Sequence, residues 1–150
     1  MESLPGPTPG TYRIRNHQSK WTVSTETNDG IAQPGDPIKT VKGAQHNFPY
    51  PNTTLIVSTD GTGLYTFRNQ KTKMFIGMGH DEHGHAVAVW TMAAQYWDVD
   101  RVQPGKFSIS FIGDAESFWY DCSEGGNPFT EVLLKESMDV DQYYWYFVAA

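Results

Sequence analysis

The chain reads "GTYRIRNHQSKWTV" at Gly10–Val23, and the same pattern returns without a gap as "GLYTFRNQKTKMFI" at Gly63–Ile76. Glycine, tyrosine, arginine, asparagine and lysine are identical at matching positions, and a weaker third copy, "GKFSISFIG", begins at Gly105. Each copy predicts a glycine turn, an alternating strand, a polar turn and a second apolar strand. Repeated use of one supersecondary unit predicts a closed, threefold, all-β fold.

Apolar runs separated by turn residues predict four short strands in each unit, and no stretch shows convincing helical periodicity. The expected strands are Tyr12–Asn16, Trp21–Ser24, Ile38–Val41, Thr54–Ser58, Leu64–Asn69, Met74–Met78, Ala86–Trp90, Tyr96–Val99, Lys106–Ile112, Phe118–Cys122, Glu131–Lys135 and Tyr144–Val148. The expected core residues are Tyr12, Ile14, Val23, Leu55, Tyr65, Phe67, Ile76, Trp97, Phe107, Ile109 and Trp145. We expect one domain over residues 10–150, preceded by a flexible, proline-rich arm over residues 1–9.

Composition restricts the partners and the compartment. The formal net charge is −6, and Lys and Arg are scattered, so the sequence offers no basic stripe for nucleic acid. No apolar run approaches the roughly 20 residues that span a bilayer, and the first residues do not resemble a signal peptide. Cys122 is the single cysteine, which excludes an internal disulfide. We therefore expect a cytoplasmic protein that binds neither nucleic acid nor membrane.

Nothing in the sequence assembles a catalytic centre. The segment "HDEHGH" at His80–His85 is the one metal-like cluster, but it lies in a tight turn without helical ligand spacing, so we expect no metal. Cys122 has no local nucleophile signature and is interpreted as a buried thiol. The carboxylate pairs Asp98/Asp100 and Asp139/Asp141 are explained as solvated charge. We expect a binding protein, not an enzyme, with no cofactor.

Unequal spacing of the repeats points to two long loops. Gly10 and Gly63 lie further apart than Gly63 and Gly105, although the first hairpins align without gaps. The surplus falls in Thr25–Pro37 and Lys42–Thr53, and loops longer than a turn requires often carry function. Proline and glycine restrict the first loop, so it could present ordered backbone to a protein partner at a reduced entropy cost.

Over its whole length, the chain resembles the fungal (mushroom) β-trefoil serine protease inhibitors of the cospin and cnispin type. The resemblance is carried by "PGTYRIRN" followed by "KWTV", by chain size and by cysteine poverty. It implies a β-trefoil of twelve strands in three units, a monomer, and substrate-like inhibition of trypsin-like serine proteases through the loop between the second and third strands. Carried onto this chain, the reactive (P1) residue is Asn28, within an inhibitory loop that includes Thr25, Glu26, Thr27, Asp29, Gly30 and Ile31.

The chemistry of that loop fits trypsin poorly. The trypsin specificity pocket holds an aspartate and prefers Lys or Arg, whereas Asn28 is neutral and its loop is acidic. Inhibition would then depend on a rigid, complementary backbone. Lys71, Lys73 and Lys135, on other loops, are the conventional pocket residues if the site lies elsewhere.

Two other functions stay open. The first is inhibition of cysteine proteases in the manner of the mycocypins, through the 42–53 loop with Asn47 and Pro49, or through a loop around Asn69 that resembles their asparaginyl-endopeptidase site. The second is carbohydrate binding by a β-trefoil lectin. A lectin would be expected to repeat an exposed aromatic residue with an acidic partner among its units, and the sequence shows no shared pair of that kind.

Overall fold

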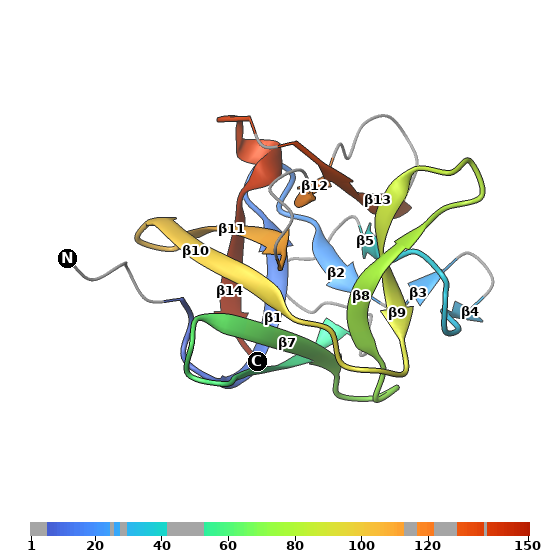
Figure 1. Ribbon diagram of the computed structural model, residues 1–150, viewed down its shortest axis with the longest axis horizontal. Coiled ribbons are helices and arrows are strands. Elements are labelled where there is room, and N and C mark those ends of the chain that lie inside the picture. Colours follow the sequence, from blue (N-terminus) through green and yellow to red (C-terminus); the bar gives the residue numbers. More distant parts are fainter. Residues whose placement is uncertain are drawn as a thin grey trace.

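The computed structural model describes residues 6–24, 26–27, 30–41, 53–112, 117–121, 129–136 and 138–150. Within these residues, twelve strands belong to one large sheet, and two very short strands form a separate one (Figure 1). No helix of the described residues is long and apolar enough to cross a membrane.

The strands follow the three sequence units. The first unit contains β1 (Gly10–Asn16), β2 (Thr22–Ser24), β5 (Lys39–Val41) and β6 (Leu55–Thr59). The second contains β7 (Leu64–Asn69), β8 (Phe75–His80), β9 (Ala86–Thr91) and β10 (Trp97–Gln103). The third contains β11 (Lys106–Phe111), β12 (Phe118–Asp121), β13 (Phe129–Lys135), the 3-10 turn η2 (Asp141–Tyr143) and β14 (Trp145–Ala149).

The first and fourth strands of each unit form a closed barrel. Antiparallel pairing runs in turn through β1, β6, β7, β10, β11 and β14 and returns to β1. The second and third strands form the hairpins β2–β5, β8–β9 and β12–β13, which contact one another through β13. A six-stranded barrel capped by three hairpins is a β-trefoil, so the fold expected from the repeat is confirmed.

The repeated turn after the first strand has the same structure in the first two units. Asn16 Oδ1 accepts hydrogen bonds from the backbone N–H groups two and three residues later, at 3.0 and 3.1 Å, and Asn69 Oδ1 does the same at 2.9 Å. Lys20 and Lys73 close the two turns with φ of 65° and 67°, a left-handed conformation that is uncommon outside glycine. The identical asparagines and lysines of the repeat are therefore turn residues.

Every residue of the expected core is buried except Tyr12, which is partly buried against it. Sequence reasoning missed Trp119, Trp90 and Ile38, all of which are fully buried. Trp119 lies at the centre of the aromatic core, with its ring 5.5 Å from those of Trp97, Trp145 and Phe67 between centroids. It was missed because the expected core was filled mainly from barrel strands, whereas Trp119 points inward from the cap.

The first and last strands of the described chain lie side by side in the barrel. Tyr12 pairs with Ala149, and the Ala150 amide donates to the Thr11 carbonyl at 3.1 Å. Before β1, the Pro7 carbonyl accepts a hydrogen bond from the Tyr65 hydroxyl at 2.8 Å. Part of the expected arm thus contacts the barrel, while residues 1–5 lie outside the described residues.

Truncating Trp97 or Trp145 should destabilise the fold strongly. Both are fully buried, and each donates its indole N–H to a backbone carbonyl. Replacing either with Ala should reduce the free energy of unfolding by about 3–5 kcal/mol in urea denaturation. Met92→Ala is the control, because Met92 is 65% exposed and should change stability by less than about 0.5 kcal/mol. A loss below about 1 kcal/mol for both tryptophans would contradict the described core.

Candidate functional site

The expected inhibitory loop contains a small hairpin of its own. β3 (Glu26–Thr27) pairs with β4 (Gly30–Ile31), with Thr27 opposite Gly30, and the pair lies at the periphery, away from the barrel (Figure 1). Thr25, Asn28 and Asp29 lie outside the described residues, so the reactive-site assignment stays a prediction. Sequence reasoning did not expect these two strands.

The second half of the same loop is held against β9. The Gly35 amide donates to the Trp90 carbonyl at 2.7 Å, and the Trp90 amide donates to the Asp36 carbonyl at 3.0 Å. Pro37 forms an isolated bridge with Val89. This part of the loop is therefore ordered by sheet-like hydrogen bonds. Of the alternative 42–53 loop, only Thr53 is described, and Asn47 and Pro49 lie outside the described residues.

The remaining inhibitor candidates differ in accessibility. Asn69 is fully buried, and its side chain organises its own turn, as described above. Lys71 and Lys73 belong to that turn, whereas Lys135 lies at the end of β13 with its Nζ 4.7 Å from the centroid of the Tyr120 ring. The structure does not bring these lysines together with the β3–β4 hairpin in any contact among the described residues.

The "HDEHGH" segment is a turn organised by Asp81. The Asp81 side chain is 5% exposed, and its Oδ1 accepts the backbone N–H groups of His83 and His85, both at 2.9 Å. Burial opposes ionisation of Asp81, but hydrogen bonds from His85, Glu131 and His83 outweigh it and lower its pKa to about 2. Within the described ranges, no group of three or more His, Cys, Asp or Glu is placed to hold a metal ion.

A cavity of about 200 Å³ lies where β6, β7 and the residue before β10 meet, and we call it the Tyr96 cavity. Its lining is Ser58, Thr59, Asp60, Thr66 and Tyr96. Ser58 lies directly opposite Thr66 in the β6–β7 ladder, and Tyr96 precedes Trp97, which pairs with Tyr65. The cavity thus joins residues that are far apart in sequence on neighbouring strands.

The chemistry of the Tyr96 cavity combines an aromatic ring, a carboxylate and the hydroxyls of Ser58, Thr59 and Thr66. Tyr96 is 42% exposed and offers an aromatic surface. Asp60 is exposed, and hydrogen bonds from the Thr62 hydroxyl and backbone N–H hold the pKa of its carboxyl below the ordinary value. Both bonds from Thr62 go to Oδ1. The sequence analysis looked for an aromatic residue with an acidic partner repeated in every unit. It therefore missed this combination, which occurs once among the described cavity residues and is brought together by neighbouring strands.

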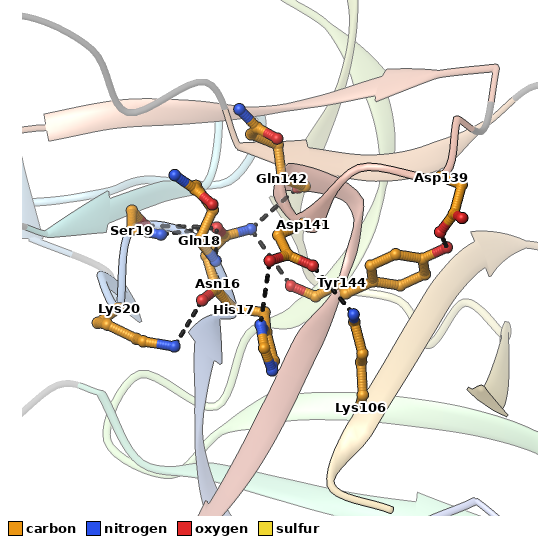
Figure 2. Close-up of polar contacts among 10 residues, drawn as sticks. All are labelled: Asn16, His17, Gln18, Ser19, Lys20, Lys106, Asp139, Asp141, Gln142 and Tyr144. Carbon is orange, nitrogen blue, oxygen red and sulfur yellow. Dashed lines mark hydrogen bonds and ion pairs between the residues drawn. The ribbon is translucent and has the colours of Figure 1, made fainter. Parts of the chain in front are cut away.

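A second polar cluster lies where the turn after β1 meets η2 (Figure 2). Asp141 joins its two sides, with Oδ1 3.0 Å from Lys106 Nζ and Oδ2 3.8 Å from His17 Nδ1. The Lys106 ammonium lies 4.7 Å from the centroid of the Tyr144 ring, and the Tyr144 hydroxyl donates to Asp139 at 2.8 Å. Asn16 Nδ2 donates to the Gln142 carbonyl at 2.9 Å, which fixes η2 against the first repeat.

Burial lowers the pKa of His17 below the ordinary value, and the nearby Lys20 adds to this, whereas Asp141 opposes it. The pKa of the Asp141 carboxyl is lowered, chiefly by its hydrogen bond with Lys106. At neutral pH the cluster therefore contains a charged Lys106–Asp141 pair beside a neutral imidazole.

Comparison with known proteins shows the fold and no family. No family model matches the chain, and no curated protein sequence matches it. The Rhizoctonia solani agglutinin is 21% identical with a TM-score of 0.76, and the match covers 100% of this chain and 99% of that one. The Macrolepiota procera ricin B-like lectin, solved in complex with lactose, is 16% identical with a TM-score of 0.72 and full coverage of both chains.

A third similar structure is much larger. A mosquitocidal holotoxin matches with a TM-score of 0.79 and 15% identity, covering 96% of this chain and 18% of its own length. The two lectin structures support the β-trefoil part of the resemblance noted from the sequence, and none of these three matches is a protease inhibitor by name.

The Asp81–Glu131 pair should make stability depend on pH. Burial, and then its hydrogen bond with Asp81, raise the pKa of Glu131 above the ordinary value, so ionising Glu131 as the pH rises destabilises the folded state. Glu131→Gln keeps a hydrogen-bond donor for Asp81 but cannot ionise. The free energy of unfolding of this variant minus that of the parent, measured by urea denaturation, should therefore be larger at pH 8 than at pH 4. A stability difference between variant and parent that is the same at both pH values would contradict the assignment.

Proposed function

We propose that this protein is a carbohydrate-binding protein and that the Tyr96 cavity is its site. The observation that carries the proposal is the presence of an exposed aromatic ring, an ionised carboxylate and hydroxyl groups in one cavity. A sugar ring presents an apolar C–H face and a rim of hydroxyls, so it can stack on Tyr96 while its hydroxyls donate to Asp60. The lectin fold neighbours support the same class of ligand.

The size of the cavity restricts the ligand. Its volume of about 200 Å³ lies below the roughly 300–1,000 Å³ of pockets that enclose drug-sized ligands. A single sugar ring fits this space better than an oligosaccharide, whose further rings would lie on the surface. Ser58 and Thr66 line the cavity with hydroxyls, which can both donate and accept.

A glycan array followed by calorimetric titration with a bound saccharide tests the proposal. Tyr96→Ala should weaken binding by about fivefold or more, because it removes a stacking interaction of about 1 kcal/mol or more. Asp60→Asn should weaken binding by a similar factor, because hydrogen bonds to a charged acceptor are stronger than those to an amide. Met92→Ala is exposed, lies outside the cavity and should bind as the parent does. An array without any bound glycan would refute the proposal, as would unchanged binding in both cavity variants.

A second candidate function is substrate-like inhibition of trypsin-like proteases through Asn28. The observation that favours it is the pairing of Thr27 with Gly30 at the periphery of the fold, because Asn28 and Asp29 connect the two paired strands. A hairpin anchored in the trefoil at both ends would hold the two halves of a cleaved loop together and favour religation over release.

Substitutions at Asn28 test this second candidate in a trypsin inhibition assay. Asn28→Lys should keep or strengthen inhibition, because a lysine can pair with the pocket aspartate. Asn28→Glu should weaken it strongly through like-charge repulsion, and Met92→Glu is the control for an added charge elsewhere. Equal inhibition by Asn28→Glu and the parent would place any inhibitory site elsewhere, and Lys71, Lys73 and Lys135 would then be tested. No inhibition by the parent would remove this candidate.

A further inference from the structure

The threefold repeat places the Tyr96 cavity at one of three equivalent positions. The residues two places after Gly10, Gly63 and Gly105 each pair with the fourth strand of their own unit. The pairs are Tyr12 with Leu55, Tyr65 with Trp97, and Phe107 with Trp145. The residues that precede these partners are therefore equivalent, and they are Thr54, Tyr96 and Tyr144.

The cross-strand partners complete each position. In the cavity, Thr66 lies opposite Ser58. At the equivalent position in the third unit, Ser108 lies opposite Asp100, next to Tyr144. At the equivalent position in the first unit, Arg13 lies opposite Val148, next to Thr54. The Tyr144 position thus has an aromatic ring, a hydroxyl and a carboxylate, the same three kinds of group as the Tyr96 cavity. The Thr54 position has no aromatic residue.

Several residues distinguish the Tyr144 position from the Tyr96 cavity: Asp100 and Val102 take the places of Ser58 and Asp60, and one further difference covers the aromatic ring. The equivalents one place after the glycine are Leu64 and Lys106. The Lys106 ammonium lies over the Tyr144 ring, 4.7 Å from its centroid, and Asp141 holds it there at 3.0 Å (Figure 2). The Lys106 side chain is only 17% exposed, so it is packed into this arrangement. A sugar ring cannot stack on the part of the tyrosine ring that the ammonium covers.

Resting on the carbohydrate-binding function proposed above, we propose that the Tyr144 position is a second saccharide site, held closed by Lys106 and Asp141. The protein therefore binds one saccharide per chain at Tyr96, and loss of the lysine opens the second position. The cation–π contact and the ion pair act together, because one ammonium satisfies both the ring and the carboxylate. Leucine at the equivalent place in the Tyr96 cavity has no such partner.

Variants in the Tyr96→Ala background test the closed site on the same glycan array. Tyr96→Ala alone should bind more weakly than the parent, and adding Lys106→Leu, which copies the Leu64 arrangement, should raise the signal again by about fivefold or more. Adding Tyr144→Ala to that double variant should remove the signal again. Lys106→Arg is the matched control, because arginine keeps both the cation over the ring and the pair with Asp141, so binding should stay as weak as in Tyr96→Ala alone. Thermal unfolding of each variant confirms that it is folded.

The outcomes separate this inference from the proposed function. If the parent binds glycans and the Tyr96→Ala/Lys106→Leu variant does not, carbohydrate binding stands and the closed site is wrong. If the parent binds none but Lys106→Leu alone binds one, the closed site stands and the Tyr96 cavity is wrong. A parent that binds two saccharides per chain in calorimetric titration would overturn the closed state of the second site. If neither the parent nor Lys106→Leu binds any glycan, both the carbohydrate-binding function and the second site are wrong.

Discussion

Two indole hydrogen bonds join the barrel to its cap, and the rest of the structure depends on them. Trp97 donates to the Ile76 carbonyl at 2.9 Å, and Trp145 donates to the Trp119 carbonyl at 3.1 Å, in both cases from a fully buried side chain. Leaving a buried donor unpaired costs about 1–3 kcal/mol, so the cap hairpins must keep their carbonyls in reach of the barrel. Trp97 and Trp145 are the first residues of β10 and β14, so these bonds also fix where the two strands begin. Tyr96 and Tyr144 each precede one of these tryptophans and lie on the outside of the barrel.

The sequence repeat predicted the fold because it reports local properties. Alternation, glycine turns and the shared asparagine predicted the twelve strands of the main sheet to within a few residues at their ends. The expected core was largely confirmed for the same reason, since inward positions alternate along each strand. Trp119 was not predicted to be a core residue, because the pattern of a single strand does not show that side chains from the cap hairpins also fill the barrel.

The candidate site could not be predicted in the same way. Ser58 and Thr66 lie on two neighbouring strands and Tyr96 immediately precedes a third, and only the register of those strands makes them neighbours. Reasoning from the sequence sought a lectin site repeated in every unit, whereas the three equivalent positions keep one backbone arrangement with different side chains. The hairpin at Glu26–Ile31 was likewise unexpected, because two-residue strands carry almost no pattern.

The pairing of the first strand with the last has a consequence for the connectivity of the chain. Since Tyr12 faces Ala149 and the Ala150 amide bonds to the Thr11 carbonyl, the start of β1 and the end of β14 meet at the place where the other units have a connecting turn. The exposed turns at Asp60–Gly63 and Pro104–Gly105 occupy the matching places in the threefold order. A circularly permuted chain, with its ends joined by a short linker and a new start at Gly105, would keep every strand pairing described here, because the barrel does not depend on which of its three turns is left open.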